Sequence, residues 1–392
     1  MIEVDATGGP HPLGMPPAKF LREYWQKRPL LIRNAFAAFE TPLMPEDLAG
    51  LACEDGVLAR IVEHDRARDA WALRTGPFDE AMFPAMPDHD WTLLVQDVDK
   101  WDADVRALLA HFAFLPRWRM DDIMVSFAAP GGSVGPHIDQ YDVFLLQAHG
   151  QRRWQIDASP NPDTSFRDDA EIKLLRRFNA SHDWLLGPGD MLYLPPGVPH
   201  NGVAEDACLT ISVGMRAPSA AELLDEYVAA LTVDADDGLR YADPDLAVPA
   251  DPFEIDAAAM QRVVAALNAL RMSGPEALAD WFGRYITTYR NAREPAPAAA
   301  PPRIELEWAL GHGARLLRHP YSRMAWRRAG KGARLYANGI DIALPVRDAR
   351  SIAASEAIDG DAYGRLTARG RDALFALLDA GHYRLLQDQT ED

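Results

Sequence analysis

The chain of 392 residues is longer than one typical domain, and its 48% hydrophobic and 25% charged content predicts two or three globular units. Residues 303–392 carry 14 Lys and Arg against 12 Asp and Glu, so the net charge of −18 leaves −20 on residues 1–302. That acidic part disfavours nucleic-acid binding and favours a basic partner, although acidic surfaces can also serve solubility alone. We find no apolar run of about eighteen residues, no secretory leader and, with only Cys53 and Cys208, no disulfide framework, so we expect a cytoplasmic protein.

Residues 1–217 are expected to form the first domain, because short β-like runs alternate there with Gly- and Pro-rich turns. Within it, the segment from Ser126 to Gln147 (SFAAPGGSVGPHIDQYDVFLLQ) predicts a Gly/Pro turn followed by a strand. Side chains alternate faces along a strand, so His137 and Asp139 should point the same way. One further histidine would complete the two-His-one-carboxylate metal set of non-haem iron(II) oxygenases.

Arg152 is the candidate anchor for an anionic co-substrate. Gly150 to Ile156 (GQRRWQI) reads as a strand in which Arg152 shares a face with Trp154 and Ile156, which mark the buried side. A buried arginine needs an anion, and a dicarboxylate such as 2-oxoglutarate offers a planar match for its guanidinium. A protein carboxylate is the alternative partner, and Arg153 should lie on the solvated face.

His200 is the candidate third metal ligand. A Gly/Asp turn, an apolar strand and a proline-rich turn lead to it from Gly187 (GPGDMLYLPPGVPH). In an antiparallel barrel, the strand that carries His200 can lie beside the one that carries His137. A lone histidine is usually structural and an HxD pair alone is a weak signal, but both motifs in this order are far more specific.

Residues 218–292 read as helices. Ser219 to Glu222 is a capping box before an apolar run, Ala257–Met272 has helical spacing, and Pro275 opens a helix with an aromatic stripe. That stripe, which comprises Trp281, Phe282, Tyr285, Ile286 and Tyr289, is expected to pack either within the chain or against a second copy.

Residues 293–302 read as a stiff Pro/Ala linker, and residues 303–392 as a small α/β domain. In the latter, Arg323–Tyr336 is expected to form a hairpin that turns at residues 329–332, and Asp372–Leu378 and the segment after it are expected to be helical.

These motifs resemble the JmjC family of 2-oxoglutarate oxygenases, and most closely its bacterial ribosomal oxygenases. The resemblance covers nearly the whole chain and is carried by five segments: Phe20–Arg33 (FLREYWQKRPLLIR), Gly135–Phe144 (GPHIDQYDVF), Arg152–Trp154, Pro195–His200 (PPGVPH) and Tyr336–Gly339 (YANG). It implies a mixed α+β protein with a cupin-like double-stranded β-helix (jelly-roll) JmjC domain over 1–217. A helical dimerisation region over 218–292 and a winged-helix-like domain over 303–392 are implied to follow.

The resemblance also implies a dioxygenase that uses iron(II), 2-oxoglutarate and molecular oxygen to 3-hydroxylate an arginine of large-subunit ribosomal protein sixteen, acting as a homodimer. His137, Asp139 and His200 are implied to hold the metal, while Arg152, Ser126 and Ser212 are implied to bind 2-oxoglutarate. Two alternatives stay open: a histidyl or asparaginyl hydroxylase or demethylase of the same family, and a non-catalytic cupin-like regulator. The near-neutral C-terminal domain argues against DNA binding by such a regulator.

Overall fold

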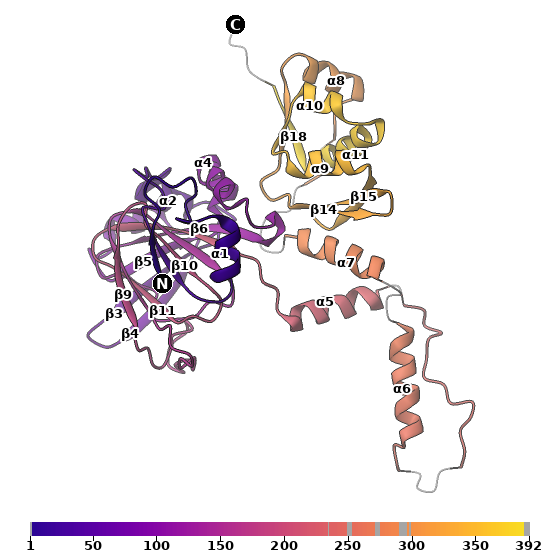
Figure 1. The fold of residues 1–392 in the computed structure, drawn as a ribbon, viewed down its shortest axis with the longest axis horizontal. Coiled ribbons are helices and arrows are strands. Elements are labelled where there is room, and N and C mark those ends of the chain that lie inside the picture. The colour runs from indigo at the N-terminus through magenta and orange to yellow at the C-terminus, as the bar shows by residue number, and fades with distance from the viewer. Residues whose placement is uncertain are drawn as a thin grey trace. The chain divides into compact units, whose positions relative to one another are not determined.

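A computed structural model of the chain describes residues 2–233, 235–248, 253–270, 275–289, 296–297 and 299–387. The chain divides into two compact units, Met1–Ala217 and Pro218–Asp392. Figure 1 shows the strands of the first unit in indigo to rose and the elements of the second in salmon to yellow. None of the helices in the described ranges is both long and apolar enough to cross a membrane.

A nine-stranded sheet dominates the first unit, in which residues 2–217 are all described. Its order is β1-β2-β10-β7-β12-β6-β5-β3-β4, and its pairs are antiparallel except for β1–β2. In that order the strands span Glu3–Asp5, Leu30–Arg33, Met191–Leu194, Val143–His149, Cys208–Met215, Met120–Ala128, Trp91–Val95, Ala59–Asp65 and Ala70–Thr75.

A three-stranded sheet, β11-β8-β9, faces the inner side of the large sheet; its strands span His200–Ala204, Arg152–Ile156 and His182–Leu186. The alternation of β7 shows the layering, because Val143 and Leu145 pack with Trp154 and Ile156 of β8. The intervening Phe144 belongs to a separate core on the other face of the large sheet. The predicted jelly-roll layout is therefore present, and its inner faces enclose a space.

Short helices pack on the outer face of the large sheet. Phe20 of the first helix lies edge-on to the Tyr193 ring, with centroids 4.9 Å apart, and beside Phe144 at 5.7 Å. Because this aromatic core fills the outer face, the polar residues on the inner face are left to line the space between the sheets. The helices are α1 (Pro17–Glu23), α2 (Pro45–Leu51), α3 (Val98–Trp101) and α4 (Ala103–Ala107), with 3₁₀ turns η1 (Glu80–Ala85), η2 (Leu108–Phe112) and η3 (Arg117–Arg119).

The second unit opens with helices α5 (Ala220–Thr232), α6 (Ala257–Ala269) and α7 (Pro275–Thr287), which confirms the three predicted helices. The predicted capping box is formed by Ser219 and Glu222. The α7 aromatic stripe is buried, and it packs within the chain: Trp281 lies 5.0 Å from the Tyr227 ring of α5. By contrast, α6 exposes a row of apolar side chains, Met260, Val264 and Leu267.

The rest of the second unit is a helix and sheet domain in which two three-stranded sheets, β17-β13-β18 and β14-β15-β16, pack with four helices within the described residues. The predicted hairpin is confirmed as β14 and β15, and the predicted helix as α11. The segment after that helix was wrongly expected to be helical, because it forms strand β18 beside β13. Of the expected linker, residues 293–295 and 298 lie outside the described residues. The elements are α8 (Arg303–Gly311), β13 (Arg315–Arg318), β14 (Met324–Ala329), β15 (Gly332–Ala337), β16 (Ile340–Leu344), α9 (Val346–Ala354), β17 (Ala357–Ile358), α10 (Gly360–Arg365), α11 (Ala368–Asp379) and β18 (Tyr383–Leu386).

Candidate active site

The HxD segment lies ahead of the strand on which we expected it. His137 and Asp139 are in an extended segment before β7, and only His137 pairs there, in a single bridge with His200 at the start of β11. The segment stays out of the sheet because the turn before it is fixed: Gly135 has φ +76°, and a Cβ on it would lie 2.3 Å from Leu174. Extended backbone still places the two side chains on one side, as alternation requires.

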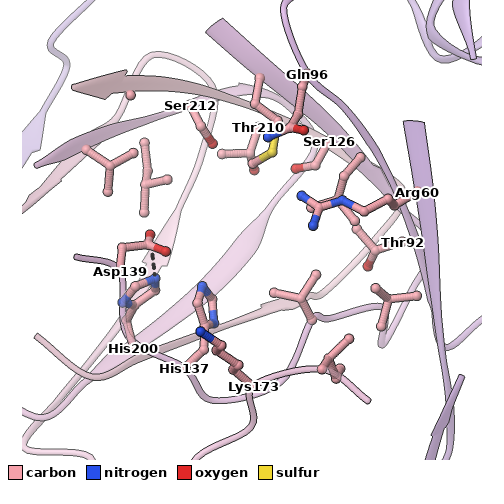
Figure 2. Close-up of a pocket in the computed structure, with 18 of the residues that line it drawn as sticks. Arg60, Thr92, Gln96, Ser126, His137, Asp139, Lys173, His200, Thr210 and Ser212 are labelled. Atoms are coloured by element: carbon pink, nitrogen blue, oxygen red, sulfur yellow. Dashed lines mark ion pairs between the residues drawn. The ribbon is translucent and has the colours of Figure 1, made fainter. Parts of the chain in front are cut away.

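Three donor groups converge at this bridge. Single ligand atoms of His137, Asp139 and His200 all lie within 4.8 Å of one another, and His200 Nε2 is 3.7 Å from Asp139 Oδ2, the dashed contact in Figure 2. The backbones of the two histidines exchange hydrogen bonds of 3.0 and 2.9 Å. The three predicted ligands, far apart in sequence, are thus brought together.

Backbone carbonyls orient both imidazoles. Nδ1 of His137 is 2.9 Å from the Gly135 carbonyl, and Nδ1 of His200 is 2.9 Å from the Val198 carbonyl. Each Nδ1 therefore carries the proton, and each Nε2 presents its lone pair to the shared space. Burial, reinforced by His137, lowers the pKa of His200, and burial raises the pKa of Asp139 against the opposing effect of His137. Two imidazole nitrogens and a carboxylate that converge in this way fit a divalent metal ion.

Arg152 is buried as predicted, at 3% exposure, whereas Arg153 points outward and pairs with Asp183 and Glu205. No carboxylate of the described chain forms an ion pair with Arg152. Its guanidinium donates only long bonds, to Ser126 Oγ at 3.3 Å, Thr210 Oγ1 at 3.4 Å and the Gly202 carbonyl at 3.2 Å.

Among the described residues the Nε of Arg152 has no hydrogen-bond partner, and burial lowers the pKa of the guanidinium. A dry guanidinium without a counter-charge is costly, so this geometry fits a bound anion. The sequence-based prediction missed Thr210, although alternation along β12 placed it on the inner face with Ser212.

The three candidate metal ligands and the buried Arg152 line one cavity of about 470 Å³ between the sheets. Figure 2 shows Asp139, His137 and His200 on one side of it, and Ser126, Thr92 and Arg60 on the other. Ser212, also predicted, lines the wall two residues along β12 from Thr210, and no hydrogen bond joins its hydroxyl to Arg152 within the described chain.

Asp122 adds an acidic group to the same cavity. It lies on β6 four residues before Ser126 and close to Gly214 of β12, and it accepts a hydrogen bond from the Asp97 amide at 3.2 Å. Its carboxyl is enclosed by protein but open to the cavity. Burial first, and then the charge of Asp97, raise its pKa to about 7. The sequence-based prediction missed Asp122, because no local signal tells it from the adjacent surface Asp121.

Family comparisons agree with this geometry. Residues 107–223 match the JmjC domain, and residues 268–384 match the ROXA-like winged helix. The chain is 37% identical over 344 residues to the ribosomal protein uL16 3-hydroxylase of Escherichia coli, which covers 86% of this chain and 88% of that one. It is also 40% identical over 231 residues to a probable ribosomal oxygenase of Haemophilus influenzae, which covers 59% and 55% of the two chains.

Solved structures of ribosomal oxygenases are similar to this chain over its whole fold. YcfD, a ribosomal oxygenase from Escherichia coli, superposes with a TM-score of 0.81 at 35% identity, over 95% of this chain and 98% of that one. A second YcfD structure, in complex with cobalt and 2-oxoglutarate, matches with a TM-score of 0.81 at 33% identity over 95% and 99%. The predicted mixed α+β class, with a cupin-like domain and a winged-helix C-terminal domain, is confirmed, and the chain belongs to the family of JmjC-domain ribosomal oxygenases.

Proposed function

We propose that this chain is an iron(II)- and 2-oxoglutarate-dependent dioxygenase that 3-hydroxylates an arginine of ribosomal protein uL16. One observation carries the proposal: a single cavity holds a His/Asp/His donor set and a buried arginine that lacks a protein counter-charge. The similarity to the uL16 3-hydroxylase of Escherichia coli supports the choice of substrate and reaction.

His137, Asp139 and His200 are the proposed metal ligands. Two imidazoles and one carboxylate leave coordination positions free for substrates, and iron(II) is the usual metal of such sets; the cobalt in the YcfD complex serves as a substitute. When bound, iron would activate molecular oxygen as 2-oxoglutarate is decarboxylated. The chain's own contribution is to hold the two Nε2 lone pairs and the Asp139 carboxylate in place and to exclude water.

Arg152 and Ser126 are proposed to bind the carboxylate of 2-oxoglutarate that lies away from the metal. Thr210 is proposed to position the guanidinium, because its hydroxyl accepts from the same guanidinium nitrogen and donates to Gln147 Oε1. The Arg152 donors would find in that carboxylate the partner that the chain does not provide. Ser212 is proposed to lie nearer the metal, since it is two residues from Thr210 along β12 in the direction of Asp122.

Asp122 is proposed to receive the guanidinium of the substrate arginine. Arg152 contacts Ser126 of β6, and Asp122 lies four residues from Ser126 on the same strand, so the cavity, which Arg60, Lys173 and Glu171 also line, holds a buried cation and a separate acidic group. An anionic co-substrate and a cationic substrate side chain are each drawn to a different one of these two groups. A substrate arginine at Asp122 would therefore reach the metal centre while the co-substrate occupies the site at Arg152.

The assembly is proposed to be a homodimer formed through residues 218–292. The exposed apolar row of α6 is the surface that supports this, because scattered apolar residues are normal but a continuous helical row is not. A ribosomal protein substrate is made in the cytoplasm, so the enzyme is proposed to act there.

The test incubates the purified chain with iron(II), 2-oxoglutarate and uL16, and follows the substrate by mass spectrometry. We expect uL16 to gain one oxygen atom on an arginine, and His137→Ala to abolish the gain. His149→Ala, which changes an exposed histidine at the end of β7, is the matched control and should retain activity. Gain of the oxygen atom on a histidine or asparagine, or loss of a methyl group, would contradict arginine hydroxylation and indicate one of the other activities of the family.

A further inference from the structure

Thr92 carries a buried hydroxyl that the chain leaves without a hydrogen-bond partner. The residue lies on β5, is 0% exposed and lines the cavity, and its Oγ1 has no partner among the described residues. In strands the branched shape of threonine is equally well provided by valine, which carries no polar atom. Burying an unmatched hydroxyl therefore destabilises the fold unless something in the cavity meets it.

Strand register places this hydroxyl one step beyond Ser126. Across the sheet, Leu94 pairs with Ser126 and Ser126 with Thr210, which form the row that touches Arg152. Thr92 pairs with Ala128 in the next row, away from Asp122. Paired residues share a face and side chains repeat every second residue, so the Thr92 and Ser126 side chains are diagonal neighbours on the inner face.

The residues paired with Thr92 on the neighbouring strands provide no good hydrogen-bond acceptor for its hydroxyl. Its row partners Val62, Ala128 and Cys208 offer no ordinary oxygen or nitrogen acceptor, and burial raises the pKa of the Cys208 thiol and keeps it neutral. Figure 2 shows Thr92 on the wall beside Ser126 and across the cavity from Asp139. An acceptor that meets this hydroxyl must therefore be a cavity ligand at the end far from the donor set.

We propose that Thr92 donates a hydrogen bond to the far carboxylate of 2-oxoglutarate, which adds a second hydroxyl donor to the site formed by Ser126 and Arg152. A carboxylate has about four lone-pair sites, so it can accept from the guanidinium and from the Ser126 and Thr92 hydroxyls at once, while the Thr210 hydroxyl donates to Gln147 Oε1. This inference rests on the proposed use of 2-oxoglutarate and deepens it, because it assigns a co-substrate-binding residue outside the recognised motifs.

The test compares Thr92→Val with the wild-type chain in two measurements. Titration of 2-oxoglutarate into protein loaded with manganese, as an inert stand-in for iron, should show Kd rising by about tenfold or more, since a bond to a charged acceptor is lost. Thermal unfolding of the ligand-free variant should show an equal or higher Tm, since the unmatched hydroxyl is gone. Thr92→Ser keeps the hydroxyl and should bind nearly as wild type, and Thr75→Val on exposed β4 is the control outside the cavity.

The Kd and Tm of Thr92→Val, and 2-oxoglutarate binding by the wild-type chain, can each contradict the proposed role of Thr92 or the proposed function. An unchanged Kd in Thr92→Val overturns the inference, because the hydroxyl is then met by water or by nothing. A lowered Tm with unchanged Kd overturns it also, since the hydroxyl is then structural. Failure of the wild-type chain to bind 2-oxoglutarate overturns the proposed function itself, and is separable because it precedes any comparison of variants.

Discussion

Arg152 and Arg153 are adjacent arginines with opposite environments, and they permit a matched comparison. Arg152→Ala removes a charge-assisted donor from a dry pocket, which typically costs about 2–5 kcal/mol, or roughly 30-fold to several-thousand-fold in affinity. We expect metal binding to persist and 2-oxoglutarate binding to weaken by that range in a calorimetric titration. Arg152→Lys should recover only part of the loss, because an ammonium is a point charge without a planar fork.

Arg153→Ala is the control for this experiment, since it removes only exposed ion pairs with Asp183 and Glu205. It should leave the Kd for 2-oxoglutarate within a few-fold of wild type. Equal losses from the two alanine variants would show that the anchor is misassigned.

Asp122 predicts a pH dependence of substrate binding. Its pKa of about 7 lies above the usual 3.8, so the folded protein keeps this proton until near neutrality, and the stability it contributes is lost as pH rises from about 4 through 7. The substrate guanidinium stays charged throughout, and it needs the carboxylate. We therefore expect KM for an arginine substrate to fall as pH rises through about 7, with the Kd of 2-oxoglutarate changing little.

Asp122→Asn should abolish that pH dependence and raise KM by about tenfold or more, because the substrate charge loses its partner. Its ligand-free Tm at pH 8 should not fall, since a buried unpaired carboxylate has been removed. Glu171→Gln neutralises an exposed carboxyl at the same cavity and is the matched control. If both variants change KM equally, the effect comes from the overall negative charge of the cavity and not from a specific contact with Asp122.

At the scale of elements, helix α7 owes its fit to a glycine. An ideal Cβ on Gly283 would lie 2.4 Å from the ring of Tyr336, whose hydroxyl is held by Asp280 and Arg327. Alanine usually stabilises a helix by about 1 kcal/mol over glycine, but overpacking against a fixed ring costs typically about 1–3 kcal/mol. We expect Gly283→Ala to lower the Tm of the second unit.

Gly364→Ala in α10 is the control, because nothing lies within 4 Å of the added carbon there. It should leave Tm unchanged or raise it slightly. If both substitutions stabilise the protein, the contact between α7 and Tyr336 is looser than the structure has it.

Local patterns predicted whole elements well. The capping box at Ser219, the hairpin of β14 and β15, and the burial of Arg152 against the exposure of Arg153 all follow from periods and turn residues within a dozen positions. The HxD segment was wrongly expected to begin its strand, because the turn that keeps it outside depends on Leu174 from a distant loop. A contact of that kind leaves no trace in the spacing of nearby residues.

The same limit applies to the cavity wall. Thr92, Asp122 and Thr210 belong to three strands whose neighbours are set by sheet order β12-β6-β5, and the sequence does not state that order. Motif residues could be found because their chemistry is rare at such spacing. The role of a wall residue depends on strand register, because the register decides whether a threonine or aspartate faces the cavity or the solvent.

At the scale of the whole molecule, α6 predicts self-association. Met260, Val264 and Leu267 repeat at helical spacing on one exposed face, and a stable dimer buries such a face. We expect the wild-type chain to sediment as a dimer at micromolar concentration, and the double change Val264→Glu with Leu267→Glu to yield a monomer. Gln261→Glu, an exposed change on the same helix, should stay dimeric; a monomeric wild type would refute the assignment.

The reciprocal backbone bonds between His137 and His200 keep two distant segments in register without help from any metal–ligand bond. A donor pair fixed in this way loses little conformational freedom on capturing an ion, so loading should proceed without a folding step. Amide hydrogen exchange in chelator-treated protein would reveal this preorganisation. The two amides should exchange slowly and at similar rates, because each bond closes the same small ring, whereas fast and unequal exchange would describe a centre that assembles around its ion.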